Sequence, residues 1–211
     1  MKTNESGRSM IEMLGVLAII GVLSVGGLAG YAKAMSKFKV NKTLDQVTQI
    51  VAGTRALFAG HKDYSALKSD TPNYKLIQKG HLVPEEMMIL DSNGALTGIE
   101  SVYAYPVKIL SAIKRSNDSS QKAFIITYEG VPQDSCVEMA TQNWGSGSSA
   151  GLVGVCVNKT DMSGVVLGAA STCSGSGENT QGCCVVSKTM SVGEASAACR
   201  LPENTVSWKF F

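Results

Sequence analysis

The feature that most constrains this chain is an uncharged apolar run close to its N-terminus. From Met13 to Ala32, 20 consecutive residues carry no charge (MLGVLAIIGVLSVGGLAGYA). At a rise of ~1.5 Å per residue, an α-helix of this length spans ~30 Å, the thickness of the hydrocarbon core of a membrane. The run therefore predicts a helix that can cross a bilayer or lie in another apolar environment.

Three general interpretations each explain part of this run. A secretory signal peptide would suit the small residues of Ala32-Lys33-Ala34, but its apolar region is usually only ~7–15 residues long. A plain single-span anchor explains the length but not Glu12, because a carboxylate in a spanning helix is costly and usually marks a function, although the position of Glu12 near one end softens the cost. A buried core helix would be unusual at an unprotected chain end. None of the three accounts for the residues that precede the run.

Those residues complete a more specific pattern. A short polar leader ends in Gly7, and the segment from Arg8 to Glu12 (RSMIE) then enters the apolar run. This resembles the type IV prepilin signature, in which a peptidase cleaves after the glycine and a glutamate stands at the fifth mature position. Cleavage after Gly7 would make Glu12 that fifth residue. The resemblance implies a prepilin peptidase as partner and possible N-methylation of the new amine, although the family usually begins with Phe or Met and this chain would begin with Arg8.

Glu12 has a role in this resemblance that its chemistry supports. A carboxylate in an apolar filament core must be paired or neutralised. The resemblance implies that Glu12 of an incoming subunit attracts the N-terminal amine of Arg8 in a neighbour and so sets the register of assembly. Within one helix the two residues are also i, i+4 neighbours, so the Arg8 guanidinium can reach the carboxylate in the same chain. The two contacts are compatible, with Arg8 shielding Glu12 before assembly.

Helical patterning continues beyond the apolar run. Apolar or small residues recur at spacings of three and four, at Val40, Leu44, Val47, Val51, Thr54 and Phe58. This predicts an amphipathic stripe that packs against the chain's own sheet, with Gly60 as a C-cap. One helix of roughly 50 residues is therefore expected.

Glycines interrupt the apolar half of this helix. Gly26 and Gly30 stand four residues apart, a spacing that allows another helix to approach closely. Alternatively, because each glycine costs a helix ~1 kcal/mol, Gly26, Gly27 and Gly30 would form a weak point that melts on assembly. Both interpretations stay open.

Strands with helical insertions follow the long helix, so the expected fold class is α+β, a helical spine on an antiparallel sheet. In the last strand Val206, Trp208 and Phe210 share one face. Asn93-Gly94 predicts a turn. The expected helical segments are Tyr74–Lys79, Pro84–Met88, Pro132–Asn143 and Ser191–Cys199, and the expected strands are Tyr103–Leu110, Ala123–Tyr128, Leu152–Asn158 and Thr205–Phe211.

The globular part is similar to the type IVb pilins, especially the conjugative thin-pilus and toxin-coregulated group. Three stretches carry this likeness: Leu76–Pro84 (LIQKGHLVP), Tyr128–Cys136 (YEGVPQDSC) and Ala198-Cys199 before the last strand. The leader is shorter than is usual in that group. The implied pilin fold divides into a leader (residues 1–7), a transmembrane and filament-core helix (8–32) and a globular domain (33–211), which consists of an amphipathic helix half (33–60) and a disulfide-rich sheet region (61–211).

All six cysteines lie between Cys136 and Cys199, and six cysteines allow 15 pairings. If the segment is exported to an oxidising compartment, structural disulfides are expected. The resemblance implies Cys136–Cys199, the family's C-terminal bond, which would clasp the final strand. Cys183 and Cys184 are adjacent and take different partners, from Cys156 and Cys173. Cys173–Cys183 with Cys156–Cys184 is the assignment preferred here, and the crossed assignment stays open.

Catalytic and metal-binding functions have little support in the sequence. The chain has only two histidines and no C-x-x-C motif, so neither a zinc site nor a redox dithiol is indicated, and no cofactor is expected. A net charge of +2 argues against electrostatic capture of nucleic acid by the chain as a whole. An enzyme is therefore not expected.

The resulting hypothesis is the structural subunit of a type IV pilus, a major pilin. It would be an inner-membrane precursor first and part of an extracellular filament afterwards, serving adhesion, conjugation or a related contact. Its expected partners are further copies of itself, the prepilin peptidase, the inner-membrane assembly machinery, minor pilins and an unidentified surface receptor. The alternatives are a minor pilin or a type II secretion pseudopilin and, from another class, a binding domain displayed on a membrane anchor.

Overall fold

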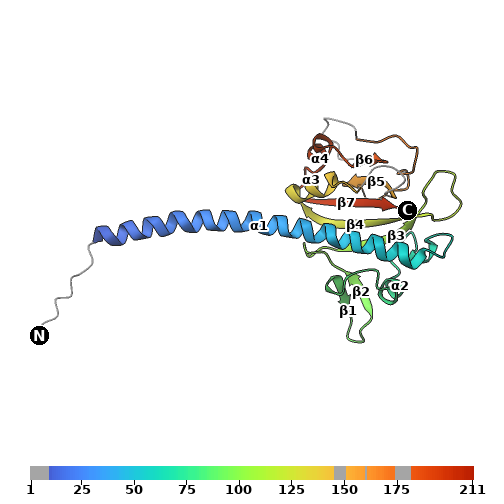
Figure 1. Ribbon diagram of the computed structural model, residues 1–211, viewed down its shortest axis with the longest axis horizontal. Coiled ribbons are helices and arrows are strands. Elements are labelled where there is room, and N and C mark those ends of the chain that lie inside the picture. Colours follow the sequence, from blue (N-terminus) through green and yellow to red (C-terminus); the bar gives the residue numbers. More distant parts are fainter. Residues whose placement is uncertain (1–9, 145–150, 160, 174–181) are drawn as a thin grey trace, which may run out of the picture. The chain divides into compact units, whose positions relative to one another are not determined.

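The structure is a computed structural model that describes residues 10–144, 151–159, 161–173 and 182–211. The chain forms two compact units, of which one ends at Phe38 and the other begins at Lys39. The helix α1, Met10–Phe58, contributes to both (Figure 1). Its 49 residues match the predicted length, and it ends two positions before the predicted cap at Gly60.

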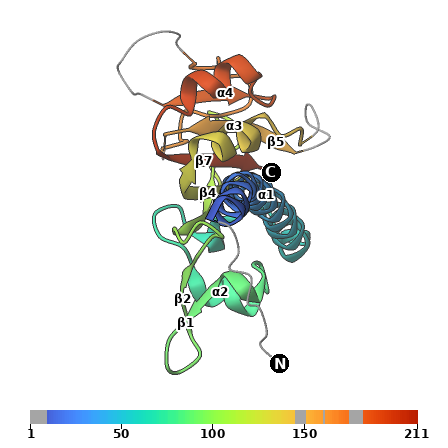
Figure 2. The ribbon, with the colours of Figure 1, turned by 90° about the vertical axis from the view of Figure 1, so that its left-hand side faces the viewer.

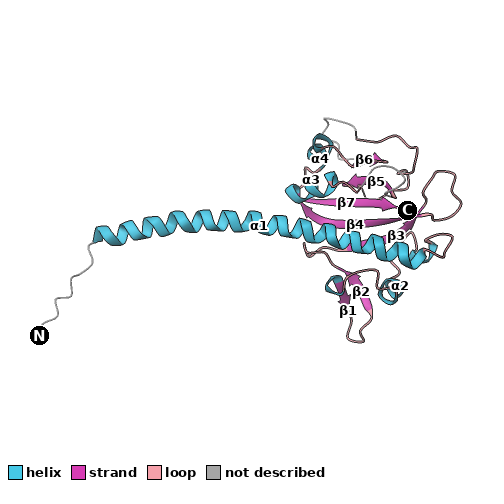
Figure 3. Cartoon of the chain, viewed as in Figure 1, coloured by secondary structure: helices cyan, strands magenta, loops and turns pink. Residues whose placement is uncertain are grey.

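The second unit is built on a five-stranded antiparallel sheet with the order β3-β4-β7-β5-β6 (Figure 3). The last strand of the chain, β7, is the central one, and it hydrogen-bonds to β4 on one side and β5 on the other. The C-terminal segment is therefore part of the middle of the fold. The strands are β3 Val107–Ala112, β4 Ala123–Pro132, β5 Leu152–Val157, β6 Cys183–Val186 and β7 Glu203–Phe210.

Smaller elements lie on two sides of the C-terminal half of α1 (Figure 2). One group lies with the sheet and comprises α3 Gln133–Thr141 and α4 Val192–Ala198. The other comprises η1 Ser65–Leu67, α2 Tyr74–Lys79, η2 Glu85–Met87 and the two-stranded hairpin of β1 Met88–Leu90 and β2 Leu96–Ile99. The long helix with an antiparallel sheet confirms the predicted α+β class.

Some local predictions were wrong. The hairpin of β1 and β2 and the strand β6 were not predicted, because strands of three or four residues are too short to show an alternating pattern. The turn predicted at Asn93-Gly94 does lie in this hairpin, and Gly94 has the positive φ of 76° that favours glycine. Tyr103 lies in a turn ahead of β3, which begins only at Val107. Pro132 ends β4 and caps α3 instead of lying inside the helix.

Two apolar clusters cover the two faces of the sheet. The larger one joins the buried face of α1 to Val206, Trp208 and Phe210, which share one face of β7 as predicted. The second lies on the opposite face and includes Met162 and Val165 from the segment after β5. The side chains of β7 that point to this second face are therefore buried too, which the alternating sequence did not predict, because alternation usually marks a strand with one solvated face.

Candidate functional site

The sequence placed the candidate assembly residues at the N-terminus, and the structure describes only part of that region. Gly7, Arg8 and the leader lie outside the described residues. Glu12 lies in the first turn of α1 and is exposed.

Among the described residues, none covers the apolar half of α1. Every residue from Met10 to Ala34 is exposed, and the large apolar side chains between Met10 and Tyr31 are 49–86% accessible. The helix is long and apolar enough to cross a membrane by length and composition. Because an apolar patch of this size is rarely left in water, the exposed side chains require lipid or other protein around them.

The three glycines singled out in this half are helical in the structure. A Cβ atom built on Gly26, Gly27 or Gly30 would meet no atom within 4 Å. Packing among the described residues therefore does not require glycine at these positions. The remaining physical reasons for glycine are the approach of another helix or local helix flexibility.

The C-terminal half of α1 is fixed to the globular domain by polar contacts as well as by its apolar stripe. Lys42 Nζ lies 2.8 Å from a carboxylate oxygen of Glu86, and Gln46 Nε2 donates to the other oxygen at 2.8 Å. These two bonds lower the pKa of Glu86. Near the end of the helix, Arg55 Nε donates to the main-chain oxygen of Phe211 at 3.0 Å. The helix is thus tied both to the hairpin side and to the end of β7.

A pair of asparagines fixes the start of β7. The side-chain amide of Asn158 donates to the Ala198 carbonyl at 3.0 Å and to Asn204 Oδ1 at 2.8 Å, while its own oxygen accepts from the amide of Thr205 at 2.9 Å. Asn158 has a positive φ of 55°, a conformation that asparagine tolerates better than most residues. Sequence reasoning missed this pair, and the only local signal is an asparagine directly after a buried strand.

The disulfides strengthen the same region. Cys136 in α3 is bonded to Cys199 after α4, which joins positions 63 residues apart. Cys156 and Cys184 are direct partners on β5 and β6 and are also bonded, and Cys173–Cys183 closes the shortest loop. The structure thus brings together the pairs preferred from the sequence and leaves no cysteine free.

Lys209 lies on the face of β7 that is turned away from α1. It is fully buried, and its ammonium donates to the carbonyl oxygens of Val165 at 2.7 Å and Met162 at 3.1 Å. Burial lowers its pKa to about 8, against the opposing charge of Asp161. Lys209 therefore fastens the segment after β5 to the central strand.

These features are contacts that stabilise the fold. Among the described residues, no group of three or more His, Cys, Asp or Glu side chains could hold a metal ion. What the geometry provides is one exposed apolar helix half and one domain whose central strand is fixed by bonds at its start, its end and its outer face.

Comparison with known proteins gives the same picture. Residues 37–210 match the family described as PilS N terminal. The fold is similar to a type IVb pilin from Salmonella typhi, with a TM-score of 0.51 and 18% identity over 80% of this chain and 97% of that one. TcpA, a type IV pilin from the El Tor biotype of Vibrio cholerae, is 16% identical over 82% of this chain and 99% of that one, with a TM-score of 0.48. No curated protein matches. The chain belongs to the PilS N-terminal family, and its fold is that of a type IVb pilin.

Proposed function

We propose that this pilin is the major subunit of its pilus. Its family makes it a structural, non-enzymatic protein. The observation that carries the proposal is the apolar surface from Met10 to Tyr31, which is exposed in the part of the chain that the structure describes. In a membrane this surface contacts lipid, and in a filament it contacts the same helices of other subunits, so one segment serves both states.

The proposed life cycle begins with a precursor in the inner membrane. Residues 1–7 form the leader, residues 8–32 the membrane helix and residues 33–211 the exported domain. The prepilin peptidase cleaves between Gly7 and Arg8, and the amine of Arg8 is then available for methylation. The inner-membrane assembly machinery moves the processed subunit into the fibre, where minor pilins accompany it and the surface carries it to an external receptor.

Glu12 sets the register in this proposal. It lies at the N-terminal end of the exposed apolar surface, where its carboxylate needs a cationic partner once the helix leaves the membrane edge. The amine of Arg8 in a neighbouring subunit neutralises it. Gly26, Gly27 and Gly30 lie farther along the same surface and allow the helix to adapt when it packs.

The three disulfides belong to the exported state. They form on the oxidising side of the membrane and stabilise a domain whose central strand comes last in the chain. A subunit at the cell surface, away from chaperones, gains most from such cross-links.

The test compares Glu12→Ala with Asp45→Ala, a matched change of an exposed acid on the same helix. Both variants should be processed to a chain that begins at Arg8, as intact mass will show. Glu12→Ala should reduce sheared surface fibres at least tenfold, and Asp45→Ala should leave them unchanged. Normal fibres in Glu12→Ala would contradict the pairing.

The same fibre preparation separates the alternatives. A major subunit accounts for most of the protein in sheared fibres. A small share would instead assign the chain to the minor pilins or pseudopilins. A wild-type chain that keeps Met1 and occurs only in membranes would indicate an anchored binding domain.

A further inference from the structure

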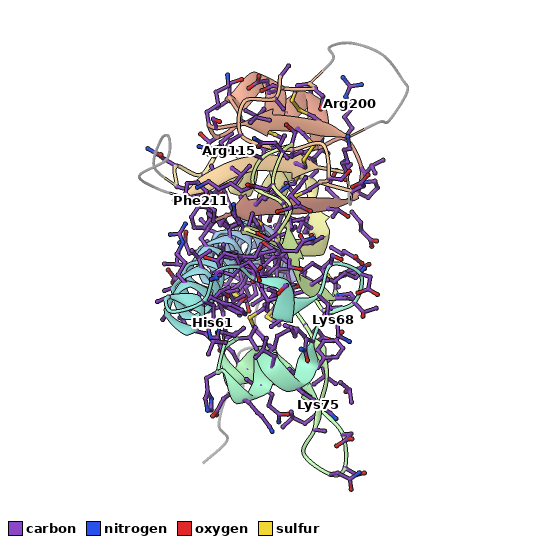
Figure 4. The ribbon with its side chains drawn as sticks, turned by 90° about the vertical axis from the view of Figure 1, so that its right-hand side faces the viewer. His61, Lys68, Lys75, Arg115, Arg200 and Phe211 are labelled. Carbon is purple, nitrogen blue, oxygen red and sulfur yellow. A yellow bond between two sulfur atoms is a disulfide. The ribbon has the colours of Figure 1, made fainter. Side chains whose placement is uncertain are left out.

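A small cavity lies beside the end of α1 in the second unit. Its volume is about 250 Å³, and it opens between the residues that follow the helix, the β3–β4 connection and Phe211. Figure 4 views this end of the domain and labels His61, Arg115 and Phe211. The function proposed above makes no use of this cavity.

The cavity is lined by three lysines from two separate segments. Lys62 follows α1, whereas Lys114 and Lys122 flank the β3–β4 turn. Lys114 Nζ stands 3.2 Å from the centroid of the Phe211 ring, a cation–π contact that holds the ammonium at the wall of the cavity. Burial, and then the nearby charges of Arg115 and Lys122, lower the pKa of Lys114. The fold thus brings like charges together around one concave site.

The carboxylates near these lysines already have bonding partners. Asp63, which also lines the cavity, accepts from the Ser65 hydroxyl at 2.6 Å and from the Ser65 amide at 3.1 Å. Asp118 accepts from Lys122 Nζ at 3.2 Å and from the Arg115 amide at 2.8 Å. Among the side chains that line the cavity, three lysines (Lys62, Lys114 and Lys122) stand against one carboxylate (Asp63), and Arg115 and Asp118 nearby add one charge of each sign. An anion in the cavity would reduce this imbalance.

Aromatic side chains form the rest of the wall. Phe58 contacts both His61 and Tyr64, with ring centroids 5.7 Å and 5.0 Å apart, and all three line the cavity. Phe211 adds a fourth ring from the opposite segment. Apolar rings combined with a few convergent charged groups are typical of a small-molecule site. Rings of this kind suit the apolar face of a sugar, and the lysines suit an attached acid group.

We propose that this cavity binds a sugar that carries a carboxylate or phosphate group. The acid group lies among Lys62, Lys114 and Lys122, and the sugar ring packs against the aromatic wall. The cavity volume accommodates about one sugar unit. The lysines surround one hollow and do not form a stripe along the surface, so the site fits a nucleic-acid duplex less well. This inference rests on the proposed function in one respect: it gives the chemical class of the surface partner that the proposed function leaves unidentified.

The experiment uses the full-length protein in a nonionic detergent, so it does not depend on fibre formation. Glucuronic acid and glucose 6-phosphate are titrated by calorimetry, with glucose as the neutral comparison. The charged sugars should bind in the millimolar range or more tightly, and glucose at least tenfold more weakly. The double variant Lys62→Gln/Lys114→Met should lose at least tenfold in affinity.

The matched control is Lys75→Gln/Lys79→Met, which removes the same charge from exposed positions of α2. Its affinity should change less than twofold, and near-ultraviolet circular dichroism should show both variants folded.

Equal losses of affinity in the two variants would indicate general charge attraction and overturn the site. Inorganic phosphate that binds as tightly as glucose 6-phosphate would overturn the role of the rings, and tighter binding of duplex DNA through the same lysines would overturn the sugar. A chain that binds but forms no fibres would contradict the proposed function alone.

Discussion

The two halves of α1 differ in whether the chain's own domain covers their apolar side chains. From Met10 to Tyr31 apolar side chains surround the helix on all sides, and all of them are exposed. From Val40 to Phe58 they form one stripe, which is buried against the sheet. One continuous helix therefore contains a segment that its own domain stabilises and a segment that needs surroundings from outside the chain. Helix length alone does not reveal this difference, whereas the angular spread of the apolar residues does.

The covered half depends on a sheet whose central strand comes last in the chain. Val47 and Ile50 are fully buried, in the same cluster as Trp208 and Phe210 of β7. The strand in turn depends on Cys199, Asn204 and Lys209 for its position. The stability of the covered half is thus linked to bonds of residues that lie more than 140 positions after α1 in the sequence. The exposed half should not depend on those bonds.

The largest expected loss of unfolding free energy comes from removing the Cys136–Cys199 disulfide, which lies just before β7. The double variant Cys136→Ser/Cys199→Ser opens a loop of 63 residues, which corresponds to about 4 kcal/mol of unfolding free energy in a chain-entropy estimate. Cys173→Ser/Cys183→Ser opens a loop of 10 residues and should lose less, at most ~3 kcal/mol. Denaturant unfolding followed by tryptophan fluorescence measures both. An equal or reversed order would show that β7 does not depend on this bond.

The next effect tests the two halves of α1 directly. Ile50→Ala leaves a cavity under the helix and should lower the unfolding free energy of the domain by about 3 kcal/mol. Leu23→Ala removes a side chain of similar size from the exposed half and should change it by less than ~0.5 kcal/mol. Both are measured in the same detergent by denaturant unfolding. A large loss in Leu23→Ala would mean that the exposed half also packs on the domain.

Much of this organisation could be predicted from the sequence because the signals are local. The uncharged run, the stripe from Val40 to Phe58 and the alternating Val206, Trp208 and Phe210 each show their periodicity within one segment. These patterns were enough for the helix, the final strand and the fold class.

The rest depends on contacts between distant segments. The bond from Lys42 to Glu86 joins two residues that look like ordinary surface charges. The cavity near Lys62 and Lys114 exists only because the end of α1 meets the β3–β4 turn. Lys209 looks like a solvated position on an alternating strand, yet it is buried because the segment after β5 folds over it. Sequence periodicity shows which face is apolar, but it does not show what covers the other face.

Lys209 provides the smallest and most selective test, because it acts on the face of β7 turned away from α1. Its pKa is about 8 in the folded protein against 10.5 for a free lysine, so between these values the unfolded chain binds more protons. The unfolding free energy of the wild type should therefore rise with pH, by on the order of 1 kcal/mol from about pH 7.5 to about pH 9.5, relative to Lys209→Met. Denaturant unfolding at both pH values measures this difference, and parallel curves of unfolding free energy against pH would mean that the ammonium is not buried.

Hydrogen exchange at pH 7 then completes the comparison of the two faces of β7. Lys209→Met should increase exchange in the segment 162–165 and leave the amides of Val47 and Ile50 protected. Faster exchange at those two residues would show that the covered half of α1 depends on both faces of the strand.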